Sequence, residues 1–386
     1  MPDSFPLLDV DHLRFYVGNA KQAAHFYAST FGLRIDQVAD LTTGSREEAS
    51  YLLTQGNIRF LLTSGLGEGH PASQEAARYG DGVKDIAFTV RDAREAFEVA
   101  RQRGAEAAYD PATLEDGKGA VTTAGIKTYG RVIHSFVSRE GGFALDRLKK
   151  GGPFLPRFRK APPLAINRYN EEHPCGLLQI DHVVGNVPEM KPVVDWYKRV
   201  LGFEVFIHYD DKDISTEYSA LMSKVMDTPI TDQGYAFRMP INEPAATRRK
   251  GKSQIQEFLD WHDQTAGVQH VALRTDDELS SVAELQRRGV DFLAIPPAYY
   301  ADVWGRVESR MGRAVEEDHQ RIRDLGILVD ADEQGYLLQL FTKPLQDRPT
   351  LFFEVICRRG NNSFGKGNFK ALFEALEGEQ ARRENL

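Results

Sequence analysis

Two histidines and one glutamate have the types and surroundings of metal ligands. His182 and His270 each lie in an apolar, β-rich segment, and Glu354 interrupts the apolar run Leu351–Ile356. A carboxylate is almost never buried without a partner, because an unpaired buried charge costs several kcal/mol. Two neutral imidazoles and one carboxylate form the facial triad that suits Fe(II) and leaves positions open for substrate and oxygen. These three residues therefore predict a metal site.

Each of the three also has a simpler interpretation. Either histidine alone is better explained as a core residue with a satisfied hydrogen bond, and Glu354 has Arg348 and Arg358 as candidate ion-pair partners. Strand alternation puts each histidine in an apolar row, with Ile180 and Val184 beside His182 and with Val268 and Ala272 beside His270.

An internal repeat singles out these two histidines among the ten in the chain. Two pairs of segments match, at offsets of 170 and 185 residues: Asp11-His12 through Phe31-Gly32-Leu33 with Asp181-His182 through Leu201-Gly202-Phe203, and Gly82–Gly104 with Gly267–Gly289. His182 and His270 thus begin successive units of one repeat, and pseudo-twofold symmetry between the units would bring their side chains face to face. Two copies that drifted apart through loop insertions explain the changing offset.

The first copy keeps only part of the candidate metal site. It has His12 where the second has His182, but Asp85 where the second has His270. Its chain then runs toward a proline-rich segment, and we expect no counterpart of the Glu354 strand. The first half is therefore predicted to be structural.

The elements that must position these residues follow one order in each unit. A strand (178–184), a helix (190–201) ending at Gly202 and a further strand (203–209) open the second half, and the order recurs with a strand (270–274), a helix (280–288) and strands at 336–341 and 351–356. We therefore predict an α+β protein with two domains, each a pair of βαβββ modules forming a curved half-barrel sheet, plus a C-terminal amphipathic helix over 366–383. The domains are residues 1–150 and 177–386, joined by a linker at 151–176 that is rich in proline and basic residues.

Length and composition fit this organisation and exclude other classes. At 386 residues the chain is long enough for about two domains. Its 48 Lys and Arg against 56 Asp and Glu give a net charge of −8, which argues against nucleic acid as a partner. Two cysteines at unrelated positions build no disulfide framework, and neither a signal peptide nor a membrane-spanning segment is apparent. We expect a cytoplasmic protein.

Five segments in the second half then resemble one family. They are Pro240–Pro244, Lys252–Gln256, Gly267–His270, Gln346–Glu354 and Phe364–Phe369. Together, in this order, they are similar to the 4-hydroxyphenylpyruvate dioxygenases of the vicinal-oxygen-chelate superfamily. The resemblance is strong in the second half and mainly architectural in the first 150 residues.

This resemblance implies an Fe(II)-dependent oxidoreductase of tyrosine and phenylalanine catabolism, whose ligands fall on His182, His270 and Glu354. It implies the conversion of 4-hydroxyphenylpyruvate and O2 to homogentisate and CO2. A 2-keto acid can chelate the metal through two oxygens and leave one position for O2. A homodimer or homotetramer is also implied.

The family's pocket residues carry over to polar and aromatic positions of this chain. Ser219, Asn242 and Gln254 are implied to hold the phenol and carboxylate, with Gln339 beside the metal and Gln269 and Pro240 in the substrate pocket. Phe341, Phe352, Phe364 and Phe369 are implied to form the walls, and the last helix to act as a lid that excludes water. For Phe341 and Phe352 an ordinary core role is an equal alternative.

Three other functions remain open. The related 4-hydroxymandelate synthases share the substrate, metal and ligands but hydroxylate the benzylic carbon. They tend to lose the residues found here as Pro240 and Phe369, which favours attack on the ring. A non-catalytic binding module and an extradiol catechol dioxygenase are the other two. The chain departs from the pattern at Asp263–Ala266, where the family usually has a glycine-rich stretch.

Overall fold

The computed structural model describes residues 5, 7–209, 221–228, 236–245 and 252–383. Its first half contains two βαβββ modules in succession. The first module comprises β1 (Leu7–Tyr16), α1 (Ala20–Phe31), β2 (Arg34–Ala39), β3 (Glu48–Gln55) and β4 (Ile58–Gly65). After α2 (Pro71–Tyr79), the second comprises β5 (Gly82–Val90), α3 (Ala93–Gln102), β6 (Ala107–Asp116), β7 (Gly119–Lys127) and β8 (Ile133–Arg139).

The second half repeats this order with more helices inserted. Its first module comprises β10 (Leu177–Asn186), α6 (Met190–Leu201), β11 (Glu204–Tyr209), β12 (Leu221–Asp227) and β13 (Arg238–Pro244), followed by α7 (Gln254–Trp261). Its second module comprises β14 (Gly267–Thr275), α8 (Glu278–Arg287), α9 (Tyr299–Met311), α10 (His319–Leu325), β15 (Leu328–Ala331), β16 (Tyr336–Phe341) and β17 (Phe352–Arg359). A 3-10 turn (Lys366–Asn368) then leads into α11 (Phe369–Arg382).

The first helix of each half ends in the same way, as the repeat predicts. Gly32 after α1 and Gly202 after α6 both adopt a left-handed backbone, with φ of 69° and 66°. Only glycine adopts that conformation without a steric penalty, so the two glycines end the helices and turn the chain into the next strand.

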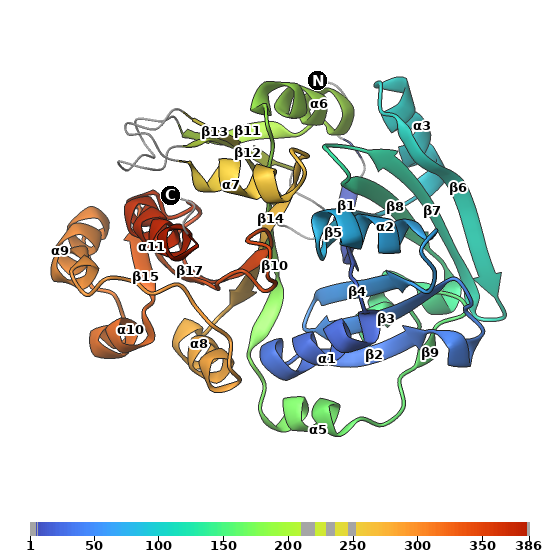
Figure 1. The fold of residues 1–386 in the computed structure, drawn as a ribbon, viewed down its shortest axis with the longest axis horizontal. Helices are drawn as coiled ribbons and strands as arrows, with labels where there is room; N and C mark the ends of the chain where they lie inside the picture. The colour runs from blue at the N-terminus through green and yellow to red at the C-terminus, as the bar shows by residue number, and fades with distance from the viewer. Residues whose placement is uncertain (1–4, 6, 210–220, 229–235, 246–251, 384–386) are drawn as a thin grey trace.

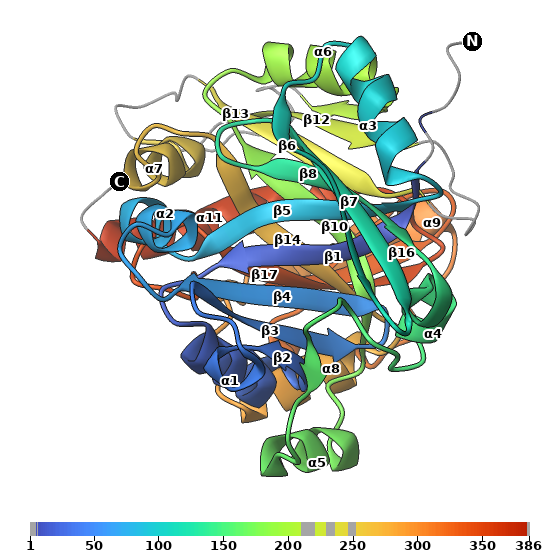
Figure 2. The same cartoon turned by 90° about the vertical axis from the view of Figure 1, so that its right-hand side faces the viewer.

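Each half folds into one curved sheet, and the two sheets have equivalent strand orders. The described residues form a sheet ordered β6-β7-β8-β5-β1-β4-β3-β2-β9 and a sheet ordered β11-β12-β13-β10-β14-β17-β16-β15. In each, the first strands of the two modules pair antiparallel at the centre, β1 with β5 and β10 with β14. The predicted α+β fold of two vicinal-oxygen-chelate domains is confirmed, and Figures 1 and 2 show the sheets side by side with α11 inside the curve of the second.

One expectation about the first half was wrong. Strand β8 pairs parallel with β5, as β17 pairs parallel with β14, so β8 is the counterpart of the Glu354 strand. The register sets Ser135 in the place of Glu354. The sequence 133–139 gave no hint of this equivalence, because a serine stands where the carboxylate would have marked it.

The main core joins the two halves. Phe353 on β17 is fully buried and its ring lies 5.1 to 5.9 Å from the rings of Tyr27, Phe31 and Phe60 in the first half. Aromatic rings at such separations add to the stabilisation that burial of their apolar area provides. The backs of the sheets therefore hold each other in place, while their concave faces stay free to form cavities.

The segment proposed as a linker belongs structurally to the first sheet. Its strand β9 (Arg159–Lys160) extends that sheet by pairing with β2. Helix α5 (Ala165–Glu172) follows, and its Asn167 donates from Nδ2 to the carbonyl of Ile35 at 2.9 Å. Before β9, α4 (Leu145–Leu148) leads the chain across the concave face. In the described part of the chain, no helix is both long and apolar enough to cross a membrane.

Candidate metal centre and substrate cavity

His182, His270 and Glu354 come together on the concave face of the second sheet. The Nε2 atoms of His182 and His270 lie 3.1 and 3.4 Å from Oε2 of Glu354. All three side chains are buried, and one ligand atom from each lies within 4.8 Å of the others. They stand on the neighbouring strands β10, β14 and β17, so the central pairing of the sheet sets their spacing.

The donor set and its spacing fit a metal ion. Two ligands about 2.1 Å from one ion and at right angles to each other are about 3 Å apart, close to the separations found here. Each imidazole also has its other nitrogen fixed, which leaves Nε2 as the ligand atom. Among the described residues, this is the single group of three or more histidine, cysteine or acidic side chains arranged to hold a metal.

A β-bulge accompanies each histidine, and this corrects the expected alternation. The pairing of β10 with β14 shifts by one residue at Asp181 and again at Gln269. An extra residue in one strand breaks the two-residue period locally, so Asp181 and Gln269 can reach the adjacent histidine. Ile180 and Val268, expected beside the histidines, instead join the main core on the opposite face.

These bulged residues orient the two imidazoles. Nδ1 of His182 lies 2.8 Å from Oδ1 of Asp181, and Nδ1 of His270 lies 3.0 Å from Oε1 of Gln269. A carboxylate or amide oxygen here accepts the Nδ1 proton, which leaves the Nε2 lone pair free for a metal. Gln269 therefore lies against its histidine, although simple alternation turns it away.

The ion-pair alternative for Glu354 is not what the fold provides. Arg358 donates from Nε and Nη2 to Asp181, at 2.8 and 2.7 Å. Arg348 donates to the backbone carbonyls of Ala77 and Arg78. The partners of Glu354 are thus the two imidazoles.

Charges in the site are tuned by these contacts. Burial alone would raise the pKa of Glu354, but attraction to His182 and hydrogen bonds with both imidazoles outweigh it and lower that pKa. Burial likewise acts to raise the pKa of Asp181, yet the Arg358 guanidinium holds it well below its usual range. For His270, burial is the largest effect and lowers its pKa, which favours the neutral form that binds metals.

A cavity opens directly onto the three candidate ligands. It is lined by their side chains together with eight of the pocket residues expected from the sequence: Pro240, Asn242, Gln254, Gln269, Phe341, Phe352, Phe364 and Phe369. The ring of Phe352 stacks on His270 at 4.8 Å, and the ring of Phe364 meets His182 edge to face at 5.0 Å.

Two of the expected pocket residues differ in placement. Gln339 is buried but does not line the cavity, and its Nε2 has no hydrogen-bond partner among the described residues. A Cβ added at Gly365 would lie 2.5 Å from that Nε2, so Gln339 packs against the turn before α11. Ser219 falls outside the described residues.

Several lining residues escaped the sequence reasoning. They are Val184, Tyr209, Ser223, Val225, Leu372 and Phe373. Ser223 and Val225 lie on β12 opposite Asn242 and Pro240. A search for the strand that pairs with the Pro240–Pro244 segment would have found both. Leu372 and Phe373 lie on the stripe already expected for the last helix.

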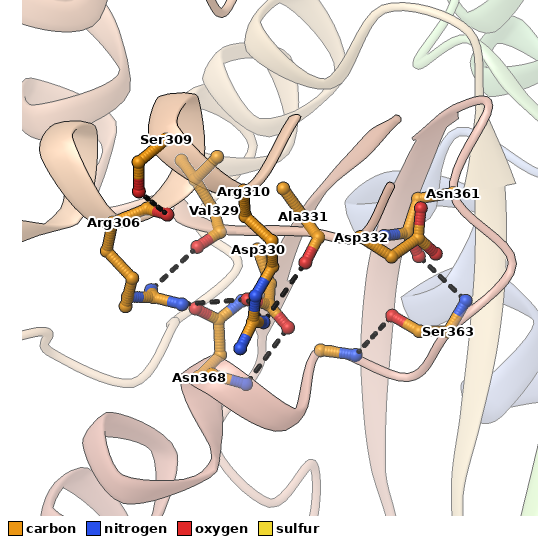
Figure 3. Close-up of polar contacts among 12 residues, drawn as sticks. Arg306, Ser309, Arg310, Val329, Asp330, Ala331, Asp332, Asn361, Ser363 and Asn368 are labelled. Atoms are coloured by element: carbon orange, nitrogen blue, oxygen red, sulfur yellow. Dashed lines mark hydrogen bonds and ion pairs between the residues drawn. The ribbon is translucent and has the colours of Figure 1, made fainter. Parts of the chain in front are cut away.

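Helix α11 covers the cavity and is anchored at its start. Asp330 on β15 is buried and accepts from Arg306 of α9 at 2.7 Å and from the backbone N–H of Gly367 at 2.9 Å. Figure 3 shows Asp330 between Arg306 and the start of α11. Next to it, Tyr299 donates to Oδ1 of Asn368 at 2.6 Å. A Cβ at Gly367 would clash with both Arg306 and Asp330, so a glycine is needed for this close approach.

The loop that departs from the family pattern has an unusual backbone. Asp263 and Gln264 have positive φ, 52° and 54°. Glycine adopts such angles freely, whereas other residues pay a conformational cost. The left-handed turn is therefore built without glycine, and Asp263 is held by an ion pair with Arg78 of α2.

The first half preserves the frame of this site without its ligands. Asp11 accepts from Arg139 and from Nδ1 of His12, as Asp181 does from Arg358 and His182. Where the second half has a second histidine and a glutamate, the first has Asp85 and Ser135, which hydrogen-bond each other.

Comparisons with known proteins agree with this fold and site. The family model of the Glyoxalase/Bleomycin resistance protein/Dioxygenase superfamily matches residues 9–128 and 179–340. Proteins named 4-hydroxyphenylpyruvate dioxygenase from Yarrowia lipolytica and Xenopus tropicalis are 43% and 44% identical, over 97% and 98% of this chain and 93% of each relative. A solved variant of 4-hydroxymandelate synthase from Streptomyces coelicolor is 28% identical, with a TM-score of 0.79 over 97% of this chain and 99% of that one.

The fold and the matching model define a member of this dioxygenase-containing superfamily. Within it, the full-length relatives at more than 40% identity are decisive. The chain belongs to the 4-hydroxyphenylpyruvate dioxygenase family.

Proposed function

We propose that this chain is an Fe(II)-dependent dioxygenase that converts 4-hydroxyphenylpyruvate and O2 to homogentisate and CO2 in tyrosine catabolism. The observation that carries the proposal is the buried triad of His182, His270 and Glu354 opening onto a cavity with aromatic walls. Fe(II) bound there would supply the activation of O2 and the chelation of the 2-keto acid.

The protein's own residues would bind and orient the substrate. Asn242 and Gln254 are buried amides on opposite elements of the wall, β13 and α7, and each can both donate and accept a hydrogen bond. They are suited to the phenol and the carboxylate, together with Ser219. The phenylalanines at 341, 352, 364 and 369 would hold the ring and keep water from the reactive centre.

The size of the cavity supports a covering role for α11. About 70 Å³ is free beneath the helix, whereas sites for small molecules usually offer at least roughly 300 Å³. Phe369, Leu372 and Phe373 would therefore have to move outward when substrate enters, and close again over it. Tyr209, whose ring meets that of Phe369 at 5.2 Å, marks the opposite edge of the opening.

The second candidate is benzylic hydroxylation, as in the related 4-hydroxymandelate synthase structure. The relatives named 4-hydroxyphenylpyruvate dioxygenase are the more similar ones, at 43% identity against 28%. Both Pro240 and Phe369 are present and line the cavity. A bulky ring at position 369 would keep the substrate's benzylic carbon away from the metal, which favours ring hydroxylation.

Product analysis tests the proposal. Purified protein with Fe(II), ascorbate and 4-hydroxyphenylpyruvate should consume O2 and yield homogentisate and CO2, identified by mass. A main product of 4-hydroxymandelate would favour the second candidate, and ring cleavage of an added catechol would favour an extradiol enzyme. Absence of both iron and turnover would favour a non-catalytic binding module.

A matched pair of variants tests the metal site itself. Glu354→Ala should lose both bound iron and turnover, because it removes the one carboxylate ligand. Ser135→Ala changes the equivalent position of the first half and should retain both. Retention of full iron and activity by Glu354→Ala would contradict the metal assignment.

The remaining parts of the proposal concern organisation in the cell. We propose that residues 177–386 form the catalytic domain, that residues 1–150 have no metal-dependent activity, and that 151–176 connect them. A reducing cytoplasm suits Fe(II) and the free, buried Cys175 and Cys357. A homodimer or homotetramer is proposed from the family resemblance, and sedimentation equilibrium would test it.

A further inference from the structure

The first half contains a large cavity at the position equivalent to the candidate active site. It measures about 750 Å³, within the usual range for small-molecule sites. His12, Asp85 and Ser135 lie in its lining at the places of His182, His270 and Glu354. Loss of the metal ligands has thus not been accompanied by filling of the space.

The surroundings of His12 also repeat those of His182. The ring of Phe154 meets His12 edge to face at 5.1 Å, as Phe364 meets His182 at 5.0 Å. The Arg139 guanidinium lies over Phe154, and that of Arg358 lies over Phe364. In both halves the chain after the last strand folds back over the concave face, so each cavity has a cover.

The base of this cavity offers hydrogen-bonding groups and no metal triad. Arg139 keeps Asp11 ionised, so Nδ1 of His12 carries the proton that Asp11 accepts at 2.8 Å, and Nε2 is left as an acceptor. Beside it, the hydroxyls of Ser135 and Tyr109 share a hydrogen bond at 2.7 Å. A ligand hydroxyl is the group that this base can both receive a proton from and donate to.

The rim and walls supply the other two features of a ligand site. Arg157 lines the cavity, and the part of the chain that the structure describes provides it with no ion-pair partner. Its φ of 74° is in the left-handed region, which costs a non-glycine residue energy and is often retained for function. Leu61, Leu155 and Phe158 form apolar walls between this cation and the polar base.

We propose that the first-half cavity binds a hydroxylated aromatic carboxylate without a metal. The ring lies between the apolar walls, the hydroxyl donates to Nε2 of His12, and the carboxylate pairs with Arg157. This site is separate from the metal centre and does not depend on the function proposed for it.

Equilibrium dialysis of the whole protein with 4-hydroxyphenylacetate, after removal of metal by a chelator, tests the proposal. Wild type should bind one equivalent. Thr123→Trp fills the cavity from the half-buried side of β7 and should weaken binding at least tenfold. Arg157→Gly removes the cation while relieving the left-handed backbone, so it should fold normally and also weaken binding about tenfold.

Controls define what would overturn it. Arg313→Gly removes an exposed loop arginine of the second half and should leave binding unchanged. Phenylacetate, which lacks the hydroxyl, should bind about tenfold more weakly than 4-hydroxyphenylacetate. No binding to wild type, or equal binding by wild type, Thr123→Trp and Arg157→Gly, would refute the site. Equal affinity for the two probes would refute the hydroxyl contact with His12.

Discussion

Arg358 donates two hydrogen bonds to the carboxylate of Asp181, at 2.8 and 2.7 Å, and the same carboxylate accepts from Nδ1 of His182. This buried relay reaches from the end of β17 to the first candidate ligand. Its copy in the first half, Arg139 with Asp11 and His12, stands next to no metal triad. The two relays therefore separate a contribution to stability from a contribution to metal binding.

We predict that Asp181→Asn lowers iron affinity about 10- to 100-fold, because His182 loses the acceptor that orients it. Asp11→Asn should cost a similar free energy of unfolding, about 3 kcal/mol for a broken buried ion pair, but leave iron affinity unchanged. Metal titration and chemical denaturation of both variants provide the measurement. Equal iron affinity in the two variants would show that the relay only stabilises the fold.

The anchor of α11 gives a second prediction. Asp330→Asn removes the charge that pairs with Arg306 and weakens the bond to the Gly367 N–H, so the helix should open more often. We expect KM for 4-hydroxyphenylpyruvate to rise about tenfold, O2 consumption to exceed product formation, and proteases to cleave α11 faster. Asp302→Asn, an exposed acid on α9, serves as control. Unchanged coupling and proteolysis in Asp330→Asn would contradict the anchoring role.

His134 predicts how stability depends on pH. It is buried between the halves, with Nδ1 2.9 Å from the Ile86 carbonyl and Nε2 2.8 Å from the Tyr197 hydroxyl on α6. Burial lowers the pKa of His134 to about 4, although the bond to Ile86 opposes this. The unfolded chain therefore binds a proton near pH 6.5 that the folded chain refuses, so stability is lost as pH falls from 6.5 toward 4.

The loss attributable to His134 is at most about 3 kcal/mol over that window. His134→Asn should be less stable at pH 7.5, because Tyr197 loses its acceptor, but its unfolding free energy should fall less between pH 7.5 and 5. His25→Asn changes an exposed histidine and should behave as wild type. Parallel pH profiles for His134→Asn and wild type would contradict this account.

Phe369 controls the predicted choice of product. Its ring lies between Tyr209 and Phe373, at 5.2 and 6.4 Å, where it limits the motion of a bound aromatic ring. Phe369→Val should allow the substrate to swing and shift part of the product from homogentisate to 4-hydroxymandelate, measured by mass. Phe373→Leu, one turn further on the same helix, should change the product ratio less. Exclusive ring hydroxylation by Phe369→Val would contradict the steric argument.

The sequence was sufficient to predict the ligands and the architecture, because both follow from the repeat. Asp11-His12 and Asp181-His182 keep the same offset as the glycines that end α1 and α6. A carboxylate in an apolar strand, Glu354, then completes a chemically recognisable set. These are signals of residue type and spacing, which survive without knowledge of the three-dimensional structure.

The details that escaped prediction depend on pairing between distant strands. Alternation gives no sign of an extra residue in a strand, so Gln269 was expected to point away and Val268 to point inward. Strand β8 was missed because Ser135 carries no chemical signature. The covering role of Arg157 and Phe158 was equally hidden, since a proline-rich segment without periodicity does not indicate what it packs against.

The bulges at Asp181 and Gln269 make chain length, as well as residue identity, a determinant of this site. Deleting one residue at either position would restore regular pairing and rotate the neighbouring part of the strand by one pleat. A histidine could then keep its place in the sequence while its imidazole turned toward the core. At these two positions a single-codon deletion would be more damaging than most substitutions, in a fold whose surface loops have accepted insertions freely.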